Sequence, residues 1–339
     1  MNLSETLKDI GEFGLIRRID ALLKREGVQA PGVTLGIGDD TASFKARHGC
    51  EVLVTCDCVV EGRHFLPGHI RPVDLGRRSM MLNISDIGAM GGYPLYALIS
   101  LGLRSETPVR DIEEMYRGFL SELNPFKASI IGGNLTESGD GIFIDITLIG
   151  EVEEGRAVRR SGAKPGDEIL VTGYPGHSAA GLQLLVQSLA PEDHPLIRDY
   201  NKPSHRAREG RAVALTGCAR AMIDTSDGFL GDLGHICEES NAGAVLVQKD
   251  FPISDQLREA AGLLKREPKE FFLRDSDDYQ LIITCHPEDV GPIRSAIALT
   301  YNGPVTKVGW ITLPDKGIRL LLPDGSEQAL SAKGWDHFR

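Results

Sequence analysis

Four short segments of this chain place aspartates beside glycine, serine or threonine, whose small side chains leave space around a carboxylate. The segments are Gly36–Asp40, Thr55–Asp57, Asn83–Asp86 and Asp224–Gly228. Carboxylates with small neighbours suit hard cations, which take several oxygen ligands. At an effective dielectric constant of about 20, two unit charges about 4 Å apart interact by roughly 4 kcal/mol. Carboxylates gathered in one cleft therefore either take up protons or hold divalent cations.

Each of these residues, taken alone, also has a structural interpretation. Asp39 or Asp40 could cap a helix, and Asp227 could form an ordinary turn with the glycine that follows it. For His64 taken alone, the favoured interpretation is a histidine packed in the core. Arg160 could be solvated or could reach a phosphate. The recurrence of the aspartate pattern, more than any one residue, favours a shared cation site.

The motifs that the chain lacks narrow the chemistry further. It has no GxxxxGK[ST] segment and no GxGxxG that opens a helix after a strand, which argues against a P-loop or Rossmann enzyme. The protein-kinase motifs, an HExxH motif and a Ser-His-Asp order are also missing. Magnesium prefers oxygen ligands and usually keeps waters shared with substrate phosphates, so it could carry a nucleotide into an acidic cleft. The pattern therefore indicates phosphoryl transfer, which needs positioning and charge neutralisation more than a covalent partner.

Apolar periodicity predicts the elements that position these residues in the first half of the chain. Expected there are a helix through Leu15–Leu23, a short strand Val52–Val54, helices Asp74–Met90 and Val109–Leu123, and a strand Ile142–Ile149 with a period of two. Asp57 would then lie at the end of the short strand. Asn83 and Asp86, three residues apart, would share a polar side of their helix.

A polar, glycine-containing stretch from Gly150 to Gly166 marks the best domain boundary, and we expect domains of residues 1–150 and 151–339. The second half is expected to hold strands Glu168–Thr172, Ala221–Ile223, Tyr279–Cys285, Val305–Ile311 and Ile318–Leu322, with helices after Gly173–Ser178 and Gly228. The loop Gly173–Ser178 could hold an anion at a helix N-terminus, although a plain strand-to-helix turn is favoured. Both halves mix helices and strands, so the fold class is α+β.

Composition limits the partners and the compartment. The chain has 339 residues, 37 basic and 48 acidic side chains and a net charge of −11, which argues against a nucleic-acid partner. Six cysteines without a CxxC pair favour reduced thiols. No signal peptide and no apolar run of about 18 residues is evident. We therefore expect a cytoplasmic protein with no membrane segment.

The motifs, in their order along the chain, resemble the thiamine-monophosphate kinase family, within the aminoimidazole-ribonucleotide-synthetase-like superfamily of ATP-using enzymes. The matching landmarks are Gly11–Phe13, Gly36–Asp40, Glu61–Phe65, Asn83–Gly91, Arg160–Asp167, Asp224–Gly228 and Gly334–Phe338. The resemblance spans nearly the whole chain. It implies a two-domain fold, a homodimer joined through the N-terminal metal- and ATP-binding domains, and Mg²⁺-dependent transfer of phosphate from ATP to thiamine monophosphate.

The same resemblance implies roles for particular residues. Magnesium would be held by Asp40, Asp57, Asp86, Asp224 and Asp227, with Thr55 and Cys56 near the metals, and Asp57, Asp86 and Asp227 would be the catalytic set. ATP would be contacted by Gly133, Asn134, Arg160 and Ser226, and the acceptor by His64, Asp277 and Trp335. A phosphate monoester has a second pKa of about 6. The acceptor is therefore already an anionic nucleophile, and the reaction needs no general base.

Three positions depart from the family pattern. Asn134 stands where the family usually has an aspartate, which removes one anionic ligand, and Cys56 replaces a threonine. The segment Arg274–Gln280 replaces the usual Gly-Gly-Glu-Asp-Tyr-Glu, so that Asp277 is one methylene shorter than the glutamate. Two alternatives stay open: an enzyme on the same scaffold with a different small-molecule acceptor, and an ATP-binding protein that has lost catalysis.

Overall fold

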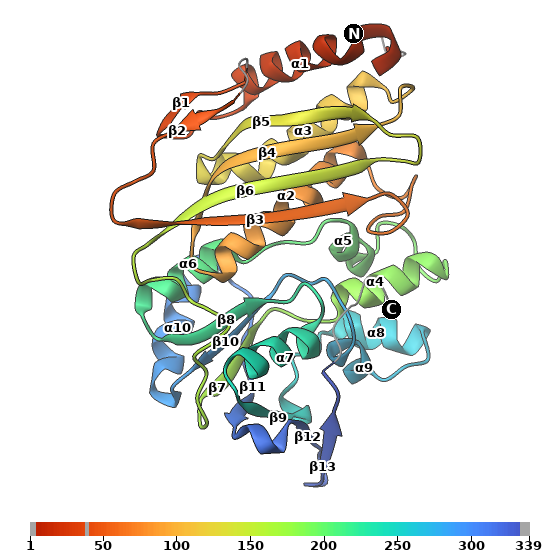
Figure 1. The fold of residues 1–339 in the computed structure, drawn as a ribbon. Helices are drawn as coiled ribbons and strands as arrows, with labels where there is room; N and C mark the ends of the chain where they lie inside the picture. The colour runs from red at the N-terminus through yellow and green to blue at the C-terminus, as the bar shows by residue number, and fades with distance from the viewer. Residues whose placement is uncertain (1–4, 38–40, 333–339) are drawn as a thin grey trace. The chain divides into compact units, whose positions relative to one another are not determined.

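The computed structural model describes residues 5–37 and 41–332. The chain divides into two compact units (Figure 1). The N-terminal unit comprises residues 1–87 and 92–154, and the C-terminal unit comprises residues 88–91 and 155–339.

The N-terminal unit is built on a four-stranded sheet of order β3-β6-β4-β5. Its strands are β3 (Cys50–Val60), β4 (Tyr93–Leu103), β5 (Ser129–Glu137) and β6 (Phe143–Glu153), and a separate pair is formed by β1 (Val33–Leu35) and β2 (Ser43–Phe44). Its helices are α1 (Leu7–Glu26), α2 (Pro72–Ala89), α3 (Val109–Leu123) and the 3₁₀ turn η1 (Asn124–Phe126). Strands β4 and β5 are parallel, and the other neighbours in the sheet are antiparallel.

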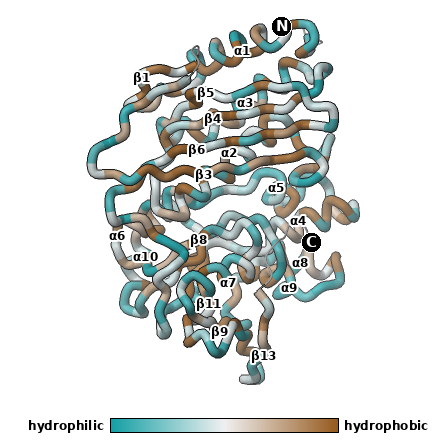
Figure 2. Tube along the Cα trace, in the orientation of Figure 1, coloured by the Kyte–Doolittle hydropathy of each residue, from teal (hydrophilic) through white to brown (hydrophobic). Residues whose placement is uncertain are grey.

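One face of this sheet forms the core of the unit. Ile144, Ile146 and Leu148 of β6 are fully buried, which confirms the predicted period of two. Much of the hydrophobic colouring of this unit follows β3, β4 and β6 (Figure 2). Helices α2 and α3 approach each other at glycines: a Cβ at Gly76 would lie 2.0 Å from the carbonyl oxygen of Met115. The helix pair therefore depends on the missing side chain.

The predicted strand Val52–Val54, with Asp57 at its end, is wrong in length. Strand β3 runs from Cys50 to Val60 and pairs with β6 at every position, so that Asp57 lies inside the strand. The full-length partner strand supplies hydrogen bonds to the backbone whatever the polarity of the side chains. Asn83 of α2 is fully buried, and its Nδ2 donates to the carbonyl oxygen of Ser79, so this polar residue of the helix does not face solvent.

The C-terminal unit contains a seven-stranded sheet of order β13-β12-β9-β11-β7-β10-β8. Its strands are β7 (Glu168–Thr172), β8 (Ala219–Asp224), β9 (Gly243–Val247), β10 (Leu281–Cys285), β11 (Val305–Thr312), β12 (Ile318–Leu321) and β13 (Glu327–Leu330). Its helices are α4 (His177–Val186), α5 (Pro195–Asn201), α6 (Ala207–Thr216), α7 (Phe229–Glu239), α8 (Asp255–Leu263), α9 (Pro268–Leu273) and α10 (Val290–Ile297), with 3₁₀ turns η2 (Gln248–Asp250), η3 (Pro287–Asp289) and η4 (Pro314–Lys316). Only β9 and β12 pair in parallel among the described neighbours of this sheet.

Helices cover both faces of the seven-stranded sheet. Alternate residues of β7 enter different cores: Ile169 packs in a cluster with Phe229 of α7, and Leu170 packs in a cluster with Val213 of α6 and Ile293 of α10. This explains why strands β7 and β10 read as continuous apolar runs, since both of their faces are buried. The result is a three-layer unit whose strand ends carry the polar loops described next.

Candidate functional site

The N-terminal unit brings Thr55 and Asp86 into contact. The hydroxyl Oγ1 of Thr55 on β3 donates a hydrogen bond to Oδ2 of Asp86 on α2. Asp57 lies two residues after Thr55 on the same strand, so the two side chains share the sheet face that meets α2. A hydroxyl and two carboxylates are oxygen donors of the kind that magnesium prefers. This part of the predicted metal set is therefore chemically consistent.

Cys56 extends from the opposite face of the same strand. Its Sγ lies 3.2 Å from Oδ1 of Asp145 and accepts a hydrogen bond from Oγ1 of Thr147. The hydrogen bond from Thr147 lowers the pKa of the Cys56 thiol, but burial and the Asp145 carboxylate raise it on balance. The protonated thiol of Cys56 lies on the face of β3 opposite to Asp57 and cannot bind a metal ion held by Asp57. Cys56 could contact such an ion only through its backbone.

Strand β5 places Gly133 and Asn134 on the far edge of the sheet from β3. Across the sheet, Asn134 pairs with Ser100, Ser100 pairs with Asp145, and Asp145 pairs with Cys58. Paired residues point to the same side of a sheet, so Asn134 lies on the face of Cys56 and Cys58 and not on the face of Asp57. Neighbouring strands lie about 4.8 Å apart, and three such steps separate β3 from β5, or about 14 Å. Within one chain, Asn134 and Asp57 therefore cannot hold the same ion.

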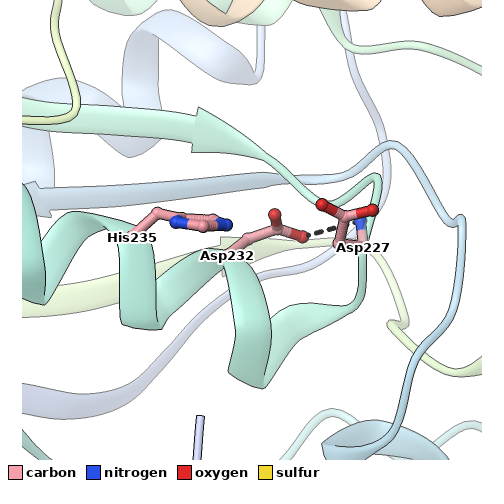
Figure 3. Close-up of side chains that lie close together, drawn as sticks. All are labelled: Asp227, Asp232 and His235. Carbon is pink, nitrogen blue, oxygen red and sulfur yellow. Dashed lines mark hydrogen bonds between the residues drawn. The ribbon is translucent and has the colours of Figure 1, made fainter. Parts of the chain in front are cut away.

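The C-terminal unit gathers carboxylates where β8 ends and α7 begins. Asp224 is the last residue of β8, and Asp227 lies in the loop before α7. Asp227, Asp232 and His235 have ligand atoms within 4.8 Å of one another (Figure 3). Oδ2 of Asp232 accepts a hydrogen bond of 3.1 Å from the backbone N–H of Asp227.

Several carboxylates crowd together at this cluster. Burial, together with the carboxylates of Asp224 and Asp227, raises the pKa of Asp232 to about 9, although the backbone N–H of Asp227 and the Arg160 guanidinium act in the opposite direction. Crowded carboxylates of this kind are stabilised by a divalent cation. Sequence reasoning missed Asp232 and His235. Their spacing of three residues, inside the helix expected after Gly228, was the signal that could have found them.

The loop 274–280 is fixed to the loop that carries these aspartates. The N–H of Thr225 donates to the carbonyl oxygen of Gln280, and the N–H of Gln280 donates to Oγ1 of Thr225. Gly228, at φ 103°, leaves no room for a side chain, since a Cβ there would lie 2.5 Å from the carbonyl oxygen of Arg274. Ser226 and Asp277, predicted to contact ATP and the acceptor, therefore lie on two loops that are hydrogen-bonded to each other.

The N-terminus of α4 is occupied by an anion from within the chain. The Asp278 carboxylate accepts hydrogen bonds from the N–H groups of Gly176 and Ser178, and Oγ of Ser276 accepts one from Ala179. Oγ of Ser178 donates to Oδ1 of Asp277. The loop Gly173–Ser178 is thus the plain strand-to-helix turn that the sequence favoured, and its N–H groups already have an acceptor.

His64 and Arg160 complete the predicted residues that the structure describes. Nδ1 of His64 accepts a hydrogen bond of 3.0 Å from the backbone N–H of Val60, so the neutral ring carries its proton on Nε2. The turn that holds His64 is closed by Glu61, whose pKa is lowered by hydrogen bonds from Arg104. Arg160 is exposed. Asp40 and Trp335 lie outside the described residues.

One arrangement was not expected from the sequence. His177 contacts Asp199 through Nδ1 (2.8 Å) and Ser254 through Nε2 (2.7 Å), in the order of a hydrolase triad. Ser254, however, is 8% exposed and caps α8 by accepting a hydrogen bond from the N–H of Leu257. A buried serine engaged in a helix cap makes a poor nucleophile, so this set has a structural role.

Both halves of the chain match models of known protein families. The family model of the AIR synthase related protein, N-terminal domain, matches residues 38–152, and that of the corresponding C-terminal domain matches residues 164–319. None of the helices in residues 5–37 and 41–332 combines the length and the apolar character needed to cross a bilayer.

Relatives of similar length share much of the sequence. The chain is 34% identical to the thiamine-monophosphate kinase of Bacillus subtilis over 97% of its own length and 99% of that protein. It is 35% identical to the enzyme of the same name from Escherichia coli K12, over 97% of this chain and 98% of that one.

Solved structures agree in fold. A thiamine-monophosphate kinase from Stenotrophomonas maltophilia matches with a TM-score of 0.80 and 31% identity, over 94% of this chain and 98% of that chain. AaThiL complexed with AMPPCP and TMP matches with a TM-score of 0.76 and 31% identity, over 99% and 100%. A hydrogenase maturation protein, HypE, in complex with ATP is 18% identical, with a TM-score of 0.77 over 95% of each chain, and shows the shared fold alone.

Proposed function

This chain belongs to the thiamine-monophosphate kinase family, and we propose on that basis that it transfers the γ-phosphoryl group of ATP to thiamine monophosphate. The observation that carries the proposal is similarity over 97% of the chain to curated enzymes of that name. The relative complexed with AMPPCP, an ATP analogue, and TMP supports the same pair of ligands for this chain.

The reaction is a direct displacement. An oxygen of the acceptor phosphate forms a bond to the γ-phosphorus of ATP, the bond from that phosphorus to the β,γ-bridging oxygen breaks, and ADP leaves with the electron pair. The acceptor enters as a dianion because its second pKa is about 6. The protein's task is to align the two phosphates and to balance their charge.

We propose that magnesium binds at two pairs of aspartates and at Asp40. The pairs are Asp57 with Asp86 and Asp224 with Asp227. Bound there, Mg²⁺ would neutralise the ATP phosphates and the charge that develops during transfer. The raised pKa of Asp232, beside Asp224 and Asp227, supports the assignment because burial and neighbouring carboxylates disfavour its charged form, which a divalent cation would stabilise. Thr55 would orient Asp86 through its hydrogen bond.

The remaining predicted residues take substrate roles in the proposal. Arg160 and Ser226 would contact ATP, and His64, Asp277 and Trp335 would contact the acceptor. The hydrogen bond from Ser178 fixes the shorter side chain of Asp277 in place. The enzyme would work in the cytoplasm, and its six free thiols agree with a reducing compartment.

We propose further that the active enzyme is a homodimer joined through the N-terminal units. Strand β3 is an edge of its sheet, and its outer face exposes Val52 (50%) and Val54 (64%). Long apolar edge strands are usually covered in the native assembly. Because Asn134 and Asp57 lie on opposite faces and edges of one sheet, we place the Gly133–Asn134 contact to ATP in the site of the other subunit.

A steady-state assay tests the activity. ADP release is measured with ATP, Mg²⁺ and either thiamine monophosphate, thiamine or unrelated phosphate monoesters. The proposal predicts turnover with thiamine monophosphate and its loss in Asp57→Asn. Turnover only with another phosphate monoester would favour the second candidate, a same-fold enzyme whose altered 274–280 loop selects a different acceptor. ATP binding without turnover on any acceptor would indicate a catalytically degenerate protein.

Mixed dimers test the sharing of sites. Asp57→Asn and Asn134→Arg are expected to be inactive separately. After random subunit exchange, half of the dimers are mixed and each mixed dimer has one intact site, so about a quarter of wild-type activity returns. No recovery after verified exchange would place Asp57 and Asn134 in the same subunit's site.

A further inference from the structure

The C-terminal unit contains a hollow of about 290 Å³ whose lining includes none of the residues given roles above. It is formed by residues 155–159, Ser161, the end of α6 and the start of β8. Three arginines line it, Arg156, Arg159 and Arg220, and no aspartate or glutamate does. In a chain with a net charge of −11, this is a local concentration of positive charge.

Two of these guanidinium groups have no counter-ion among residues 5–37 and 41–332. Some arginines elsewhere in the chain are paired with carboxylates, as Arg18 is with Glu5 at 2.7 Å and Arg77 with Glu122 at 2.6 Å. The side chains of Arg156 and Arg159 make no ion pair or hydrogen bond with the residues that the structure describes. Arg220 lies 3.4 Å from Oδ1 of the buried Asp167. The hollow therefore keeps at least two unneutralised positive charges.

The backbone around the hollow is held in place. The N–H of Met222 on β8 donates to the carbonyl oxygen of Arg159 at 3.0 Å, and the N–H of Val158 donates to that of Met90 at 3.1 Å. Nη1 of Arg156 lies 3.2 Å from the position that a Cβ of Gly217 would take. The arginines thus project from fixed backbone, although Arg156 also lies at the C-terminal end of α6, where a positive charge is favourable by itself.

We propose that this arginine hollow binds a small phosphate-bearing anion, with a diphosphate group as the best fit, at a site separate from that of phosphoryl transfer. Guanidinium groups match phosphate oxygens through paired, charge-assisted hydrogen bonds. The volume is at the lower end of the roughly 300–1,000 Å³ typical of ligand pockets. It suits a phosphate or diphosphate group better than a whole nucleotide.

Arg159 and Arg160 are adjacent in sequence but act at different places in the C-terminal unit. The charge of Arg160 acts on the carboxylate cluster, where it partly opposes the rise in the pKa of Asp232 that burial and the neighbouring carboxylates cause. Arg159, the residue before it, lines the hollow. An anion in the hollow would therefore be held one residue away from a group proposed to contact ATP, yet by different side chains.

Isothermal titration of the full-length protein with inorganic diphosphate tests the proposal. EDTA and a phosphate-free buffer keep the proposed metal sites from binding the probe. The double variant Arg156→Ala with Arg159→Ala is expected to weaken binding by about tenfold or more. The matched control, Arg17→Ala with Arg258→Ala, removes two exposed arginines outside the hollow and is expected to bind like the wild type. Raising the salt concentration should weaken binding in both the wild type and the control.

Two further measurements keep the result interpretable. The variant Arg156→Lys with Arg159→Lys retains charge at the end of α6 but loses paired hydrogen bonding, and it should keep the wild-type melting temperature while binding diphosphate several-fold more weakly. Titration with ADP shows whether the diphosphate group of a larger molecule also enters. The proposal would be overturned if the wild type did not bind diphosphate. It would also be overturned if the double alanine variant bound diphosphate with the affinity of the wild type and differed only in a lower melting temperature, which would leave the arginines a structural role.

Discussion

Replacing Asp278 with alanine is predicted to destabilise the C-terminal unit by about 3–6 kcal/mol, since two hydrogen bonds to a charged group are lost at about 1.5–3 kcal/mol each. The side chain is 7% exposed, and its carboxylate accepts from the N–H groups of Gly176 and Ser178, the latter at 2.8 Å. Both donors belong to the beginning of α4, where no residue of the helix itself can accept from them.

The cost of burying the carboxylate decides where in that range the value falls. Burial raises the pKa of Asp278, and the two backbone hydrogen bonds oppose the shift. Removing the side chain also removes this penalty, so the expected loss lies near the lower end, about 3 kcal/mol. Asp278→Asn keeps one carbonyl oxygen as an acceptor and is expected to lose about half as much.

Urea unfolding followed by tryptophan fluorescence measures the effect. Trp310 lies on β11 of the C-terminal unit, so its signal reports on the part that contains α4. The matched control is Asp275→Ala, an exposed aspartate of the same loop, expected to change stability by less than about 0.5 kcal/mol. A loss below about 1 kcal/mol for Asp278→Ala would refute the argued role of these hydrogen bonds.

Other substitutions and reagents test other parts of the molecule. Asp57→Asn should lower kcat by about a hundredfold or more at an unchanged melting temperature, because it removes an anionic ligand from the charge-balancing set. Asn134→Asp should restore the anionic ligand usual in the family and lower the Mg²⁺ concentration that gives half-maximal activity. Val54→Asp should convert a dimer into a monomer in light scattering, because a charge would be buried in the proposed interface. Cys237 and Cys285, whose pKa values burial raises to about 12, should not react with a thiol reagent at pH 8 until the protein is unfolded, since only about one thiol in ten thousand is ionised.

The substitutions and the thiol-labelling experiment each have their own control or contrary result. Leu299→Asp changes an apolar residue that is 84% exposed in the C-terminal unit, and it should leave the dimer intact. A dimer that survives Val54→Asp would move the interface elsewhere. An unchanged magnesium requirement in Asn134→Asp would mean that this position holds no metal. Rapid labelling of native Cys237 would show that α7 opens readily.

Elements with a clear apolar period could be predicted from the sequence. Helix α3 has the predicted bounds, and β7 likewise, because their apolar residues recur without interruption. Strands β4 and β9 were not predicted, since buried glycine, alanine and proline break the alternation that marks a strand. Local pattern could not show the true length of β3 either, because its partner β6 stabilises the polar half.

The site residues stay a prediction, and the sequence could not show which of them lie together. The hydrogen bond between Thr55 and Asp86 depends on the packing of α2 against a strand about thirty residues away in sequence. The face on which Asn134 lies depends on a register shift between β4 and β5, which no local pattern reveals. Asp278 was not singled out in the sequence, because the backbone N–H groups that it contacts belong to the beginning of α4, about a hundred residues earlier. Tertiary pairing, rather than residue type, decided these features.

The most direct test of the proposed function follows the transferred phosphorus. The protein is incubated with ATP labelled at the γ-phosphorus, Mg²⁺ and thiamine monophosphate, and the products are separated. The proposed reaction predicts the label in the terminal phosphate of thiamine diphosphate, in a one-to-one ratio with ADP and with none in Asp57→Asn. Label found only in inorganic phosphate, or no ADP at all, would contradict it.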